Sequence, residues 1–135
     1  MDIYTDNIDI EVKKFLKKLN SSCIHLKAAI PYFDLPEVLA CYNIGMVVYK
    51  GIISNHIYSV PNKIFEYIAC GLGVVYSKEL VSTSLFQKKF ALTQMTAINF
   101  KNISNFSISV PNKSSIKNFE EIKNSTNLLN SIKAA

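Results

Sequence analysis

The chain has 135 residues and a net charge of +5, and 49% of its residues are hydrophobic. This balance predicts a globular domain and excludes a disordered chain, while the apolar runs are too short to span a membrane as a helix. All of the positive charge comes from lysine, since the sequence has no arginine, which argues against a protein that reads base edges in nucleic acid.

The cysteine pattern indicates neither disulfides nor a metal site. Cys23, Cys41 and Cys70 show no metal-ligand spacing, so we expect reduced, mostly buried thiols and no bound metal. Acidic residues near the N-terminus do not fit a secretory signal. We therefore expect a cytoplasmic protein, with peripheral association at the inner face of the membrane as an alternative.

The first quarter of the chain predicts a strand, a helix and a second strand. Residues 3–5 fit a short strand. Apolar residues then recur at helical spacing over 8–19, and Asp6 or Asn7 is the expected N-cap of that helix. Residues 22–27 alternate in polarity as a strand does, and His25 within them is expected to be a structural residue rather than a ligand.

The next stretch predicts a helix followed by a buried strand. Asp34 and Glu37 fit a capping box that opens a helix over 34–41. The apolar run at 44–49 predicts a buried strand, and residues 50–60 are expected to form a loop.

The most informative stretch, 59–76, predicts a helix that begins at Pro61 and ends at Gly71, followed by a strand over 73–77. Further on, 79–90 and 91–100 suit a helix and a strand, and the residues after 114 suit amphipathic helices.

Alternating strands and helices predict an α/β fold with a Rossmann-like parallel sheet and helices on both faces. We expect residues 1–77 to form the nucleotide-binding core of this fold. Residues 78–135 form a less regular, partly helical C-terminal part of the same domain in this interpretation.

The helix that begins at Pro61 has the features of a phosphate site. Its first turn presents backbone N–H groups and the positive end of the helix dipole, which favour anions. Lys63 adds a cation, and Glu66 adds a carboxylate that accepts hydrogen bonds from vicinal sugar hydroxyls. The alternative is a solvated surface pair between Lys63 and Glu66 at i, i+3.

The run from Pro61 to Val75 resembles the donor-binding segment of GT-B glycosyltransferases of the retaining "glycosyl transferases group one" type, and residues 33–45 resemble the helix and strand that precede it. The resemblance implies a nucleotide-sugar site in which Glu66 bonds the ribose hydroxyls. Lys63 and the backbone amides near Pro61 and Asn62 would then face the pyrophosphate, and Ser59 would cap the helix.

The chain departs from that family at one position. Many members carry a Glu, seven intervening residues and a second Glu, and the first of these holds the donor sugar. Tyr58 occupies the position of the first Glu, and Asn55 or His56 could substitute for it; a solvent-exposed loop is the other expected role of His56. The resemblance also places Tyr58 in the lining of the sugar pocket beside Ser59.

Pro31, Tyr32 and Phe33 lie where the family wraps the nucleotide base, and they are expected either to stack on the base or to serve as ordinary packing. The resemblance begins at the family's second strand. The chain therefore looks like the C-terminal, donor-binding half of a GT-B enzyme without its first strand, so that a missing N-terminal half or partner chain is expected.

The resemblance implies a glycosyltransferase that moves a sugar from a nucleotide diphosphate to a glycan or lipid-linked acceptor in polysaccharide or glycoconjugate synthesis, with no cofactor and no required metal. No catalytic residue emerges from the sequence. An inactive or partner-dependent nucleotide-sugar-binding fragment is the main alternative. A basic nucleic-acid-binding protein is a remote one.

Overall fold

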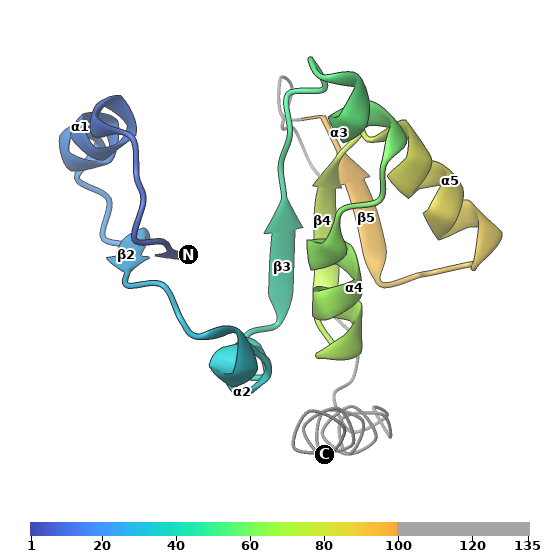
Figure 1. Cartoon of the computed structure of the whole chain (residues 1–135), viewed down its shortest axis with the longest axis horizontal. Coiled ribbons are helices and arrows are strands. Elements are labelled where there is room, and N and C mark those ends of the chain that lie inside the picture. Colours follow the sequence, from blue (N-terminus) through green and yellow to red (C-terminus); the bar gives the residue numbers. More distant parts are fainter. Residues whose placement is uncertain (100–135) are drawn as a thin grey trace, which may run out of the picture. The chain divides into compact units, whose positions relative to one another are not determined.

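The computed structural model describes residues 1–99, which form an α/β fold of parallel strands and helices. The chain divides into two compact units, the first over Met1–Leu35 and the second from Pro36 onward (Figure 1). The predicted helices after residue 114 lie outside the described residues.

The first unit consists of β1 (Asp2–Tyr4), α1 (Ile10–Leu19) and β2 (His25–Lys27), followed by a 3-10 helix over Tyr32–Asp34. The two strands pair in parallel, with Ile3 opposite Leu26. The strand–helix–strand order was predicted, although β2 is shorter than the expected 22–27.

The N-cap of α1 corrects the prediction. Asp9 caps the helix, and its carboxylate accepts hydrogen bonds from the backbone N–H groups of Glu11 at 2.8 Å and Val12 at 3.4 Å. The expected cap, Asp6, instead accepts a bond from the backbone N–H of Ala29 at 2.9 Å. Asp6 thus connects two loops that are distant in sequence, a contact that local capping rules do not reveal.

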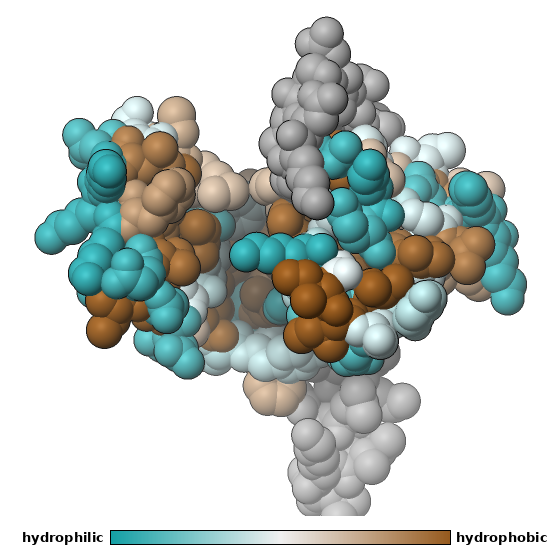
Figure 2. Space-filling model, turned by 90° about the horizontal axis from the view of Figure 1, so that it is seen from above, coloured by the Kyte–Doolittle hydropathy of each residue, from teal (hydrophilic) through white to brown (hydrophobic). Residues whose placement is uncertain are grey.

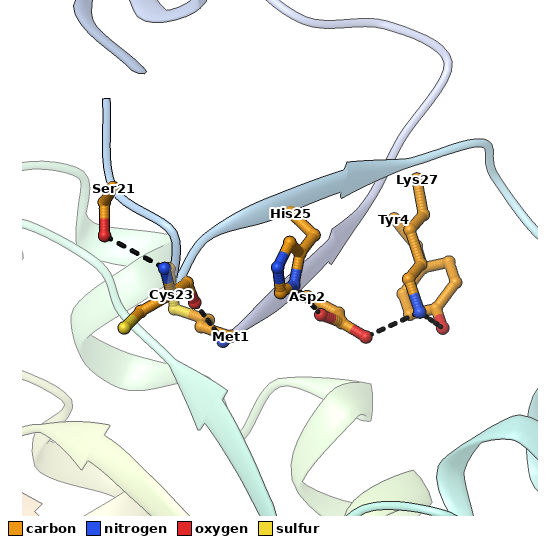
Figure 3. Close-up of polar contacts among 7 residues, drawn as sticks. All are labelled: Met1, Asp2, Tyr4, Ser21, Cys23, His25 and Lys27. Atoms are coloured by element: carbon orange, nitrogen blue, oxygen red, sulfur yellow. Dashed lines mark hydrogen bonds and ion pairs between the residues drawn. The ribbon is translucent and has the colours of Figure 1, made fainter. Parts of the chain in front are cut away.

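A row of polar side chains joins the two strands on one face of this small sheet (Figure 3). The carboxylate of Asp2 lies 3.0 Å from His25 Nδ1 and 2.7 Å from Lys27 Nζ. Lys27 also donates to the Tyr4 hydroxyl at 3.4 Å, and its bonds to Asp2 and Tyr4 raise the pKa of its ammonium group. The pairing of His25 with Asp2 agrees with the structural role expected of that histidine.

The second unit has a three-stranded parallel sheet in the order β3-β4-β5, whose strands span Ile44–Val47, Gly73–Ser77 and Met95–Ile98. Its helices are α2 (Leu35–Leu39), which begins at the last residue of the first unit, α3 (Ser54–Tyr58), α4 (Asn62–Ala69) and α5 (Val81–Lys89). The central strand β4 is buried throughout and has the predicted bounds. Both α5 and β5 come after β4 in the chain and belong to the same unit.

The segment 50–60 is not wholly a loop, because it contains α3. The backbone N–H groups of His56 and Ile57 donate to the carbonyl of Ile53 and start this helix. With the bounds Ser54–Tyr58, α3 is too short to show a helical period in the sequence.

The core lies between the sheet and the helices α4 and α5. Its buried side chains come from the strands, from α4 and from the start of α5: Val47, Ile64, Val74, Tyr76, Leu80 and Met95. Gly45 lies against Tyr67 of α4, and Tyr76, two residues after Val74, bonds to α5 through Ser84. Since Gly45 is paired with Val74 in the sheet, α4 and α5 cover the same face. The expected presence of helices on both faces of the sheet stays a prediction, because α4 and α5 account for one face only.

All three cysteines are free thiols in this structure. Cys23 and Cys41 are exposed and only Cys70 is buried, which corrects the expectation of mostly buried thiols. Within residues 1–99, no helix has the length and apolar character needed to cross a bilayer.

Candidate functional site

The candidate site lies at the beginning of α4. This helix runs antiparallel to the strands of its sheet, so its N-terminus faces the edge at which the strands end (Figure 1). Ligands of open α/β sheets bind at the carboxyl ends of the strands. The helix is held in place by Ile64, which is fully buried, and by Tyr67, whose ring lies against Gly45.

The first turn of α4 leaves backbone donors available. Pro61 is the N-cap residue in an extended conformation, and no side chain caps the helix. The backbone N–H groups of Asn62 and Lys63 have no hydrogen-bond partner among residues 1–99, whereas that of Ile64 donates to the Pro61 carbonyl at 2.9 Å. Two amide donors and the positive end of the helix dipole therefore meet at one point.

Ser59 does not cap this helix, which corrects the prediction. It directly follows α3, and its hydroxyl donates to the backbone carbonyl of Asn55 within that helix. The sequence pattern predicted that this hydroxyl would bond to α4, but it bonds to α3 instead.

Lys63 and Glu66 lie within one turn of α4 and form an ion pair, with 2.9 Å between Nζ and Oε2. The Glu66 side chain is 21% exposed and that of Lys63 is 52% exposed. The surface pair foreseen as the alternative interpretation is therefore present. Oε1 of Glu66 has no partner among the described residues, so the carboxylate retains a free acceptor.

The residues that precede α4 fall into two environments. Tyr58 ends α3 and is 69% exposed. His56 stacks on Tyr49, with 4.4 Å between ring centroids and 25° between ring planes. His56 is thus half-buried in a helix rather than exposed in a loop, which corrects that expectation.

Tyr49 and Ser77 were missed by the sequence reasoning. The buried hydroxyl of Ser77, at the end of β4, accepts a hydrogen bond from the backbone N–H of Tyr49 at 2.7 Å. Both residues lie at the carboxyl end of a parallel strand. Because ligands bind at these ends, their position after a predicted strand was the signal that could have identified them.

Pro31, Tyr32 and Phe33 belong to the first unit. The rings of Tyr32 and Phe33 are 70% and 62% exposed and meet edge to face at 6.0 Å. This exposure does not fit the ordinary-packing interpretation of these aromatic residues. The stacking interpretation stays a prediction.

The burial of two titratable side chains on and next to α4 makes the stability of the fold depend on pH. It raises the pKa of the Tyr67 hydroxyl and, together with the charge of Glu66, that of the Cys70 thiol, above their ordinary values of 10.0 and 9.0. When folding raises the pKa of a group, the group makes its full contribution to stability at pH values below its pKa in the unfolded state. That stability is lost as the pH rises through the folded-state value.

We therefore expect the free energy of unfolding to fall as the pH rises above the ordinary thiol value of 9.0, and to fall further above the ordinary tyrosine value of 10.0. Urea unfolding at half-unit pH steps measures this decline. The Cys70→Ala variant should show a smaller decline with a later onset. A free energy that stays constant above both values would contradict the prediction.

Within residues 1–99, no three potential ligands from His, Cys, Asp and Glu come together as a metal site. Comparisons of the chain with models of protein families, with characterised proteins and with solved structures gave no match.

Proposed function

We propose that the second unit binds a nucleoside diphosphate sugar at the start of α4, as the donor domain of a GT-B glycosyltransferase. One observation carries the proposal: the first turn and a half of α4 brings together a lysine, a carboxylate and two backbone N–H groups. Among residues 1–99, these N–H groups and one oxygen of the carboxylate have no partner. Donors and a cation suit a pyrophosphate, and a carboxylate suits the ribose hydroxyls.

The same groups suggest how the site would act on its substrate. Negative charge develops on the leaving nucleoside diphosphate as the sugar bond breaks. Fixed amide donors and the Lys63 ammonium would stabilise that charge without reorganising. Glu66 would orient the nucleoside through the ribose and would take no part in bond breaking. In this proposal the acceptor is a glycan or lipid-linked molecule, and transfer takes place in the cytoplasm or at the inner face of the membrane.

The test is a binding assay by thermal unfolding, with UDP, GDP, ADP, CDP and their sugar derivatives. A ligand at 100 times its Kd should add about 2.7 kcal/mol to the stability of the chain. Replacing Glu66 with Gln removes two charge-assisted hydrogen bonds and should weaken binding by about ten- to a hundredfold. Isothermal titration of the nucleotide that shifts the melt measures this loss.

The chain offers a matched control for this variant. Glu11 forms an ion pair with Lys14 at i, i+3 and 3.0 Å on α1 of the first unit, with the same spacing as Lys63 and Glu66 but with the glutamate first. Glu11→Gln should leave nucleotide affinity unchanged. Equal losses in the two variants, or no shift with any nucleotide, would overturn the proposal.

A binding module without turnover is the second candidate. The observation that favours it is the exposure of the apolar side chains of α1, such as Ile10 at 70% and Phe15 at 62%, which suits a unit that works with a partner. Nucleotide binding without release of the sugar, measured with an added acceptor, would support this candidate over a complete transferase.

A further inference from the structure

The outer edge of β3 is unpaired in the three-stranded sheet of the second unit. The carbonyl of Asn43 and the backbone N–H of Tyr49 point toward β4, where they bond to Gly73 and Ser77. Because successive residues of a strand point to opposite sides, the backbone groups of Ile44, Met46 and Val48 point the other way. They have no hydrogen-bond partner among residues 36–99, the described part of the second unit.

The residues of this edge differ from those of the strands in the first unit, whereas β5 (Met95–Ile98), at the other edge of the same sheet, is uncharged as well. Natural edges carry charged residues, proline or bulges, which discourage further pairing. In the first unit β1 contains Asp2, and β2 contains His25 and Lys27. From Ile44 to Tyr49, β3 and its extension have no charge, no proline and no bulge. The sequence at this edge has the composition of an interior strand.

Apolar side chains beside the edge are exposed as well. Met46 is 43% and Val48 is 49% exposed, and both lie on the face opposite α4. Figure 2 shows that apolar side chains are also exposed at other places on the surface. A strand added to β3 would satisfy the open backbone groups and place its own apolar side chains beside those of Met46 and Val48.

We propose that the β3 edge binds an extended apolar segment of a partner polypeptide, which adds to the sheet as a further parallel strand. The parallel sense follows from the three described strand pairings, all of which are parallel. Lys50 follows the edge, is exposed and forms no described ion pair. In parallel pairing it meets the C-terminal end of the added strand, so the segment that fits best is apolar and ends in acidic residues.

The test uses the full chain and a fluorescent synthetic peptide of alternating valine and threonine that ends in two aspartates. Fluorescence anisotropy measures its Kd. The peptide should bind the chain, and the same peptide ending in two lysines should bind about two- to fivefold more weakly, because it loses the contact with Lys50. Lys50→Glu should reverse this preference.

Proline at position 46 is the decisive variant. Met46→Pro removes one open-edge N–H and leaves the bonds to β4, so binding should weaken at least about tenfold. Met46→Ala, which keeps the N–H, should bind within about threefold of the unaltered chain. If Met46→Pro unfolds the chain, Met46→Lys, which adds a charge at the edge, should show the same loss of binding.

Three results would overturn the proposal. The first is the absence of binding by either peptide, and the second is equal affinity of the proline or lysine variant and the unaltered chain. The third is a dimer of the 15.2 kDa chain, seen by light scattering and abolished by Met46→Pro or Met46→Lys, which would show that a second copy occupies the edge.

Discussion

Replacing Tyr76 with alanine should lower the free energy of unfolding by about 3–5 kcal/mol, as truncation of a buried aromatic side chain does. Tyr76 is 1% exposed in the core cluster of the second unit. Its hydroxyl donates to Gln87 Oε1 at 2.5 Å and lies 3.3 Å from Ser84 Oγ, from which it can accept a hydrogen bond. Because whole domains are stable by only about 5–15 kcal/mol, this single change removes a large share of the total.

Chemical unfolding followed by circular dichroism measures the effect and divides it into two parts. Tyr76→Phe keeps the ring and removes the hydroxyl, leaving the Gln87 carbonyl oxygen without this donor, and should cost about 1–3 kcal/mol. Tyr58→Phe, at a side chain that is 69% exposed, is the matched control and should change the stability very little. A Tyr76→Phe variant as stable as the control would contradict the role of the hydroxyl.

Replacing Gly45 with alanine should destabilise the second unit by about 1–3 kcal/mol or more, because the added methyl group has no space. A Cβ at this position would lie 2.2 Å from Cδ2 and 2.4 Å from Cγ of Tyr67. Either the ring or α4 must move, and the core between α4 and the sheet would lose its packing.

A double-mutant cycle tests this steric cause. Tyr67→Ala removes the ring, so adding Gly45→Ala to it should cost much less than Gly45→Ala does alone. Val48→Ala, next to the same strand and 49% exposed, serves as the control for alanine in this region and should have a small effect. Additive losses in the double variant would show that the contact with Tyr67 is not the cause.

The elements read best from the sequence are those with strong local signals. The strand Gly73–Ser77 was predicted with its observed bounds, because it is a continuous apolar run between a glycine-terminated helix and a polar turn. The helix α4 was predicted from its two end signals. Pro61 stands at its start, and Gly71, which has a positive φ of 72°, follows its end. Lys63 and Glu66 were therefore placed correctly on one helical turn.

The errors arise where contacts distant in sequence compete with local rules. Asp6 bonds to Ala29, so Asp9 takes the cap of α1. Ser59 bonds within a short helix that no periodicity reveals. The apolar side of α1 was recognised, but the spacing of apolar residues along a helix does not say whether that side is covered, and Phe15 remains 62% exposed.

The side chain of Gln87 has a consequence for the alignment of the sheet. Its amide nitrogen donates to the Met95 carbonyl at 2.6 Å and to that of Leu92 at 3.3 Å, while its oxygen accepts from Tyr76. One residue of α5 thereby fixes the start of β5 against β4. A slip by one residue would break these bonds and turn the apolar face of β5 outward. Gln87, a helical residue outside the sheet, thus helps to hold β4 and β5 in their register.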